Sequence, residues 1–79
     1  MKNLYNVEDW TDIPYRRLGE ILMEAGIINL FHLSMALDVQ RFHKMPMGEI
    51  FLAMKVINKK DLKQALFVQK TIQKRYNNV

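Results

Sequence analysis

The chain contains an internal repeat, and this feature constrains its fold more than any other. Residues 17–40 read RLGEILMEAGIINLFHLSMALDVQ, and residues 46–69 read PMGEIFLAMKVINKKDLKQALFVQ. The two 24-residue copies align without a gap across a five-residue spacer, RFHKM, and ten positions are identical at an offset of 29. Since each copy of a repeat is usually one supersecondary unit, we expect one unit built twice. The identical pairs include Gly19/Gly48, Asn29/Asn58 and Gln40/Gln69.

The first copy predicts a short helix followed by a longer one. Apolar residues from Leu18 to Ala25 recur at helical spacing. Gly26 can end this helix, because glycine adopts the left-handed conformation without steric cost. Asn29 suits the N-cap of the second helix. The apolar face of that helix comprises Leu30, Leu33, Ala36 and Leu37.

The second copy predicts the same pair of helices. Asn58 repeats the N-cap, and the last helix is expected to run to about residue 76. The sequence therefore predicts an all-α fold, in which two tandem helical hairpins form a small four-helix bundle. The short apolar stripe of this copy comprises Met47, Ile50, Phe51 and Met54.

Residues 1–15 lie outside the repeat. We expect them to form an N-terminal arm that packs aromatic side chains onto a single helical domain, residues 16–79, because a chain of 79 residues has the size of one domain. The large side chains of this arm are Tyr5, Trp10, Ile13 and Tyr15.

Composition excludes several kinds of site. The chain has no cysteine, so it has no disulfide framework or cysteine-based zinc site, and its two histidines, His32 and His43, make a poor metal site. No apolar run reaches the roughly 18 residues that span a bilayer. The first ten residues lack the features of a signal peptide. We therefore expect a cytoplasmic protein with no metal and no transmembrane segment.

We also expect no catalysis. The sequence contains no phosphate-binding P-loop motif, no nucleophile elbow and no HExxH motif. Glu20 and Glu49 recur in the two copies, but each suits the first turn of a helix, where a negative charge complements the helix dipole.

The charge is unevenly distributed. Residues 1–40 carry three basic and six acidic side chains, and residues 41–79 carry nine basic and two acidic ones, so net charges of −3 and +7 sum to +4. A basic half can attract an anion such as a nucleotide, a nucleic acid, a membrane surface or an acidic partner. It is equally typical of a solvated helix face.

The repeat resembles the long tandem motif of MshEN domains. These domains are N-terminal modules of the ATPases of type II secretion and type IV pilus assembly, and they bind the bacterial second messenger cyclic di-GMP. The resemblance covers residues 17–69, about two thirds of the chain. It rests on Arg17, Leu18, Gly19, Leu22, Gly26, Leu33, Leu37 and Gln40 in the first copy and on Met47, Gly48, Leu62, Leu66 and Gln69 in the second.

The resemblance implies cyclic di-GMP as the ligand and a signal relayed in trans to a protein partner, such as a secretion or pilus ATPase or a regulator. A duplicated unit would offer two similar half-sites to this two-fold symmetric molecule. The implied binding residues are Arg17, Leu18, Gly19, Leu22, Leu33, Leu37, Gln40, Pro46, Met47, Gly48, Leu62, Leu66 and Gln69.

The chemistry of these residues suits that ligand. The planar guanidinium of Arg17 can pair with O6 and N7 of guanine. Gly19 and Gly48, near helix starts, would let a base or phosphate approach the backbone closely. Gln40 and Gln69 can donate and accept in one plane, which suits a base edge.

The second copy departs from the first at two motif positions. Pro46 stands where the first copy has Arg17, so that half-site lacks the arginine. Lys55 stands where the first copy has Gly26, where lysine ends a helix less cleanly or could meet a phosphate.

Two other functions fit the sequence. One is a protein–protein docking module that keeps this fold without the ligand, as part of a secretion or pilus system. The other is nucleic-acid binding, which we rank last, because a reading helix needs exposed basic or amide residues at its start. The start of the last helix offers Lys59, Lys60, Lys63 and Gln64.

Overall fold

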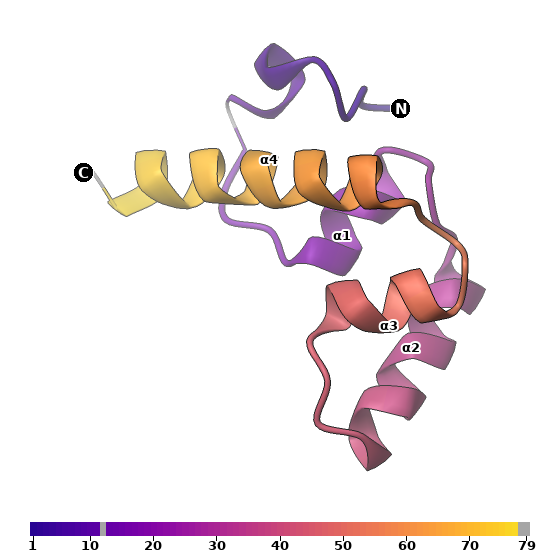
Figure 1. Cartoon of the computed structure of the whole chain (residues 1–79). Coiled ribbons are helices and arrows are strands. Elements are labelled where there is room, and N and C mark those ends of the chain that lie inside the picture. Colours follow the sequence, from indigo (N-terminus) through magenta and orange to yellow (C-terminus); the bar gives the residue numbers. More distant parts are fainter. Residues whose placement is uncertain (12, 78–79) are drawn as a thin grey trace.

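All regular secondary structure in the part of the chain that the structure describes is helical. The computed structural model describes residues 1–11 and 13–77, with side chains up to residue 74. Residues 12, 78 and 79, which the predicted arm and domain include, lie outside the described residues. A short 3-10 helix, η1 (Val7–Trp10), precedes four α-helices (Figure 1). These are α1 (Leu18–Glu24), α2 (Leu30–Phe42), α3 (Met47–Ala53) and α4 (Lys59–Asn77). The predicted all-α class is confirmed.

The longer helix of each copy begins at a capping asparagine. The Asn29 side-chain oxygen accepts a hydrogen bond from the backbone N–H of His32 at 2.9 Å. The Asn58 side-chain oxygen accepts one from the backbone N–H of Asp61 at 2.7 Å. Each bond satisfies a donor that a helix leaves free in its first turn. Both predicted caps are confirmed.

The shorter helix of each copy ends in the same left-handed turn. Gly26 has φ +75°, as expected of the residue that ends α1. Lys55, 29 residues later, has φ +61°. Lysine carries a β-carbon that disfavours this conformation. The second copy therefore keeps the turn of the first although it lacks the glycine that suits it.

The main helix packing joins one copy to the other. α1 packs chiefly against α4, and α2 packs chiefly against α3, while α1 and α3 also touch. Burying one helix against another supplies most of the driving force for a small helical domain. The fully buried side chains at the centre include Ile21, Leu22, Ile50, Phe51, Ala65 and Val68.

The N-terminal segment lies across α4. Leu4 and Trp10 are buried in the core, and the Trp10 indole N–H donates to the carbonyl of Asn3 at 2.9 Å. The Gln64 side-chain amide donates to the carbonyl of Leu4 at 3.1 Å. In Figure 1 this segment lies on one side of α4, and α2 and α3 lie on the other. It therefore covers part of α4 and leaves the cleft side described below open.

Glu24, at the end of α1, joins this segment to the first copy. Its carboxylate accepts from Arg16 Nε at 2.9 Å and from Lys2 Nζ at 3.2 Å. Partial burial raises the pKa of Glu24, but these two hydrogen bonds outweigh it, so the pKa lies below its ordinary value. The second copy has Ala53 at the equivalent position and makes no such link.

Candidate functional site

Two adjoining clefts open where the two copies meet. The first has a volume of about 500 Å³ and the second about 450 Å³. Leu18 and Met47 line both clefts, so the two hollows share a wall. The first cleft is lined by Arg17, Leu18, Gly19, Glu20, Leu33, Leu37, Gln40, Met47 and Gln69. The second cleft is lined by Leu18, Pro46, Met47, Gly48, Glu49, Leu62 and Leu66.

Equivalent positions of the repeat build equivalent walls. Leu37 and Leu66 occupy the same repeat position, and their side chains are exposed to almost the same degree, 48% and 46%. The shared wall is also made of an equivalent pair, because Leu18 and Met47 are 29 residues apart. The apolar lining of the two clefts thus follows the duplication.

The terminal glutamines of the two copies make a reciprocal pair of hydrogen bonds. Gln40 Nε2 donates to the carbonyl of Met45 at 3.2 Å, and Gln69 Nε2 donates to the carbonyl of Arg16 at 3.2 Å. Arg16 and Met45 are again 29 residues apart. Each glutamine therefore holds the backbone just before the other copy's short helix. Neither glutamine Oε1 takes part in a hydrogen bond with the described residues, so both remain available as acceptors.

The two helix-start glycines allow a close approach within each copy. A β-carbon on Gly19 would lie 2.6 Å from Leu33 Cδ1, and one on Gly48 would lie 2.7 Å from Leu62 Cδ1. Non-bonded carbon atoms normally stay roughly 3.5–4.0 Å apart. Any side chain at these glycines must therefore push a leucine methyl aside. Leu33 and Leu62 both line clefts, so the displaced methyl would have open space beside it.

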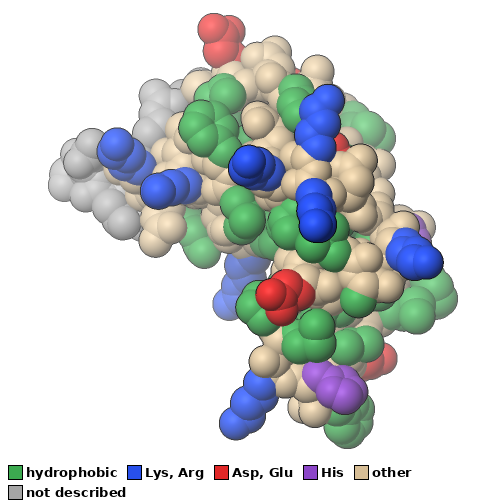
Figure 2. Space-filling view, viewed as in Figure 1, with side chains coloured by type: hydrophobic (Ala, Val, Ile, Leu, Met, Phe, Trp, Pro, Cys, Tyr) green, Lys and Arg blue, Asp and Glu red, His purple; other side chains and the backbone are tan. Residues whose placement is uncertain are grey.

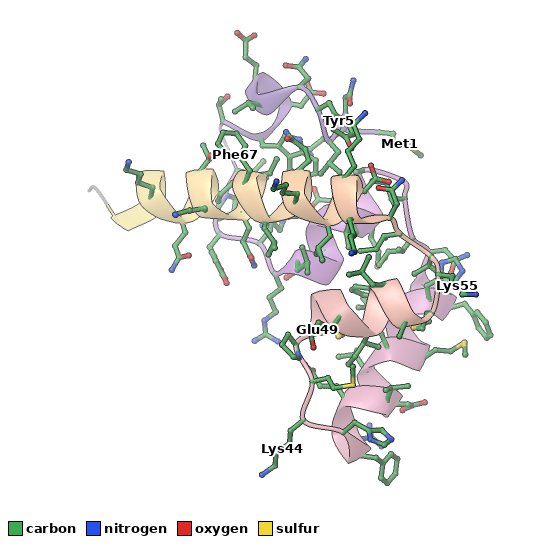
Figure 3. The ribbon with its side chains drawn as sticks, viewed as in Figure 1. Met1, Tyr5, Lys44, Glu49, Lys55 and Phe67 are labelled. Atoms are coloured by element: carbon green, nitrogen blue, oxygen red, sulfur yellow. The ribbon has the colours of Figure 1, made fainter. Side chains whose placement is uncertain are left out.

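The clefts differ in polarity. The first contains Arg17, whose exposed guanidinium makes no ion pair or hydrogen bond with the described residues. It also contains both terminal glutamines. The second has Pro46 in place of the arginine, and Glu49 is its one polar lining side chain (Figure 3). An anionic or hydrogen-bonding group is therefore better matched to the first cleft, and an apolar or aromatic surface can enter either.

Of the predicted binding residues, all line one or both clefts except Leu22. Leu22 has no exposed surface, because it lies on the side of α1 that packs into the core. Sequence reasoning missed Glu20 and Glu49, which it interpreted only as first-turn charges, although both line clefts. The sequence did contain a sign of their role, because Glu20 and Glu49 are an identical pair that follows the paired glycines.

Among the described residues, no three His, Cys, Asp or Glu side chains gather as metal ligands do.

Comparison with known proteins identifies no relative of this chain. Protein-family models, curated proteins and solved structures yield no match to this chain. None of the helices within the described ranges has both the length and the apolar character needed to cross a membrane.

Proposed function

We propose that this chain is a non-enzymatic receptor for cyclic di-GMP, with the ligand held across the two adjoining clefts. The observation that carries the proposal is that equivalent positions of the two copies line the two clefts and share one wall. Cyclic di-GMP has two guanines and two phosphates related by two-fold symmetry, so a duplicated site matches a duplicated ligand. In this proposal the two copies act as tandem hairpins, and residues 1–15 act as an arm that braces them.

The polar groups of the first cleft suit a guanine. Arg17 offers a guanidinium that no described partner neutralises, and it can pair with the O6 and N7 acceptors of guanine. The free Oε1 atoms of Gln40 and Gln69 can accept from the base N–H groups. Leu18 and Met47, on the shared wall, would then lie between the two bases.

The proposed output is a protein partner contacted in trans in the bacterial cytoplasm, such as a secretion or pilus assembly ATPase or a regulator. A receptor without chemistry of its own acts only by binding a partner differently with and without its ligand.

Calorimetric titration with cyclic di-GMP tests the proposal. We expect saturable binding, and little or no heat from cyclic di-AMP or GTP, because adenine lacks the O6 acceptor and GTP lacks the second base. The melting temperature should rise as the ligand concentration passes the dissociation constant. A well-folded chain that shows neither effect at high micromolar ligand would overturn the proposal.

The variant Gly48→Ala tests ligand binding and fold stability separately. The new methyl would meet Leu62 Cδ1 at 2.7 Å, and we expect Leu62 to turn into the second cleft. Alanine favours helix over glycine by up to about 1 kcal/mol, so thermal stability should stay close to that of the wild type. Cyclic di-GMP affinity should fall sharply, and Gln69→Ala should lower it too. If Gly48→Ala instead unfolds easily and the wild type binds no ligand, the glycine serves helix packing alone.

A second candidate function, ligand-free protein docking, is favoured by one observation. α2 exposes large apolar side chains, among them Phe31 at 68% and Phe42 at 80% exposure, and it buries only Ala36 completely. Exposed apolar surface on one helix is typical of an interaction site. Under this function, substitutions at Phe31 and Phe42 would abolish partner binding, and cyclic di-GMP would have no effect on it.

A further inference from the structure

The exposed side of α4 carries a row of lysines. Lys59, Lys63, Lys70 and Lys74 are all exposed, and at 100° per residue they fall on one side of the helix, with Phe67 beside them. We name these five residues the basic stripe. At 1.5 Å per residue it is about 22 Å long. Figure 2 shows Lys and Arg side chains spaced along α4, with hydrophobic side chains among them.

The charge of the basic stripe is not neutralised within the described part of the chain. None of the ion pairs there uses a lysine of α4. Asp61 is the one acidic residue of α4, and its carboxylate accepts a hydrogen bond from the Tyr5 hydroxyl on another side of the helix. Four like charges along one helix face repel one another, so an anionic surface placed against them would relieve that repulsion.

Phe67 adds one large apolar side chain beside the lysines, about halfway along the stripe. Its side chain is 53% exposed, and Figure 3 labels it on α4. Along the helix axis Phe67 comes between Lys63 and Lys70. The helix side that packs into the core is already occupied by Ala65, Val68 and Ile72, so Phe67 cannot be buried without turning these out. A large aromatic flanked by lysines on both sides is the pattern of a helix that lies on a membrane, where the ring enters the headgroup boundary and the lysines reach the phosphates.

We propose that the basic stripe docks α4 onto an anionic phospholipid surface. The side of a straight helix presents its residues in a line, so a flat bilayer can meet all four lysines at once. Each lysine near an anionic bilayer strengthens binding about 5-fold, and a cluster of four or more is typical of segments that bind anionic lipid. This inference does not depend on nucleotide binding, because no residue of the stripe lines either cleft.

Lipid is favoured over nucleic acid by the side chains that are present. Base recognition in duplexes uses bidentate Arg, Asn or Gln side chains, and the described residues of the stripe are lysines and one phenylalanine. A single-stranded nucleic acid would need more than one stacking ring along its track, and the stripe offers one. An acidic protein surface would need a pocket matched to Phe67, whereas a bilayer accepts the ring anywhere.

Vesicle co-sedimentation without nucleotide tests this proposal. The full chain should bind vesicles that contain phosphatidylglycerol and not vesicles of phosphatidylcholine alone, and binding should weaken as salt is raised. The double variant Lys63→Gln/Lys70→Gln should lower the partition coefficient about 25-fold, from about 5-fold per lysine. Phe67→Ser should lower binding to the same vesicles while leaving the salt dependence unchanged.

The matched control is Arg41→Gln/Lys44→Gln, which removes the same charge from exposed positions on α2 and its following loop. Lys44 lies far from α4 (Figure 3). This control should lower vesicle binding less than 3-fold, and circular dichroism should show all variants folded. The proposal is overturned if both double variants lose binding equally, if neutral vesicles bind as well, or if single-stranded oligonucleotides bind and anionic vesicles do not.

Discussion

The two copies of the repeat agree in their apolar residues and differ in the polar residues at their surface. Ile21 and Ile50, an equivalent pair, are both buried, as are Ala36 and Ala65. At the cleft rim, however, the first copy places Arg17 where the second has a proline. Among the described residues, an ion pair, Lys2–Glu24, ties the N-terminal segment to the first copy, whereas the second copy meets it through the hydrogen bond from Tyr5 to Asp61. The apolar pattern is what folding requires of both copies. The rim is free to change, so the two clefts share a shape and differ in their chemistry.

The largest expected effect tests whether the buried side chains of the two copies contribute equally to the free energy of unfolding. Leu22 and Phe51 are equivalent and have no exposed surface. Leu22→Ala should cost about 2–5 kcal/mol and Phe51→Ala about 3–5 kcal/mol, through lost burial and the cavity left behind. Urea unfolding followed by circular dichroism measures both. Because the helices pack across the copies, each variant should still unfold in one transition. Two separate transitions would show that the copies are independent.

The next largest effect compares how much the two equivalent rim residues, Arg17 and Pro46, contribute to ligand affinity. Arg17→Ala should weaken cyclic di-GMP binding by about 1–2 kcal/mol, roughly 5- to 30-fold, because a charge-assisted hydrogen bond is lost. Pro46→Ala, at the equivalent position, should do much less, since proline offers only shape. Calorimetric titration compares the two. Equal losses would contradict the assignment of Arg17 as the residue that reads the base.

A third test compares the two left-handed turns. Lys55→Gly should stabilise the fold by up to about 1–2 kcal/mol, because it relieves the unfavourable φ of +61°, less the entropy that glycine adds to the unfolded chain. Gly26→Ala should destabilise it, since φ is +75° there. Lys55→Ala is the control, because it changes the charge and keeps the β-carbon. A stabilisation of Lys55→Ala equal to that of Lys55→Gly would show that charge, and not the backbone, is responsible.

The smallest effect concerns the carboxylate that the second copy lacks. The pKa of Glu24 in the fold is below its ordinary value of 4.5, so its stabilisation is fully present at neutral pH and is lost as the pH falls through the lowered pKa. These partly exposed ion pairs contribute about 0.2–1 kcal/mol. Glu24→Gln should therefore lose that amount in urea unfolding at pH 7 and differ less from the wild type at pH 3. Glu8→Gln, on the exposed side of η1, should show no such change.

Local signals in the sequence predicted most of the helix boundaries. Asparagine caps and a terminating glycine act on their immediate neighbours, so Asn29, Asn58 and Gly26 indicated where helices begin and end. The last helix, expected to reach about residue 76, ends at Asn77. Lys55 was harder to predict. Its left-handed conformation comes from the helices on either side of the turn, and lysine's own preference points the other way.

Helix partners could not be predicted in the same way. Periodicity shows which side of a helix is apolar, but it does not show which other helix covers it. It also does not separate a core from a cleft wall. Leu37 and Leu66 follow the apolar pattern and are about half exposed, whereas Leu22 follows it and is buried. The repeat alone does not make that separation either, because it marks the buried pair Ile21/Ile50 as it marks Leu37/Leu66. The candidate binding residues came from the resemblance of the repeat to a known tandem motif, and of those residues Leu22 lies in the core.

The crossed pairing of helices makes this chain comparable to a homodimer whose two subunits have been joined by a five-residue link. Each copy's short helix rests on the other copy's polypeptide, and the reciprocal glutamine bonds hold the joint. The two copies of one chain can pack together in this way only if the link between them is long enough. With a shorter link, the same contacts would form between two chains, which exchange copies in the manner of a domain swap. The RFHKM segment, whose first two residues belong to α2, is therefore where we expect a deletion to change a single chain with a complete pair of clefts into a dimer.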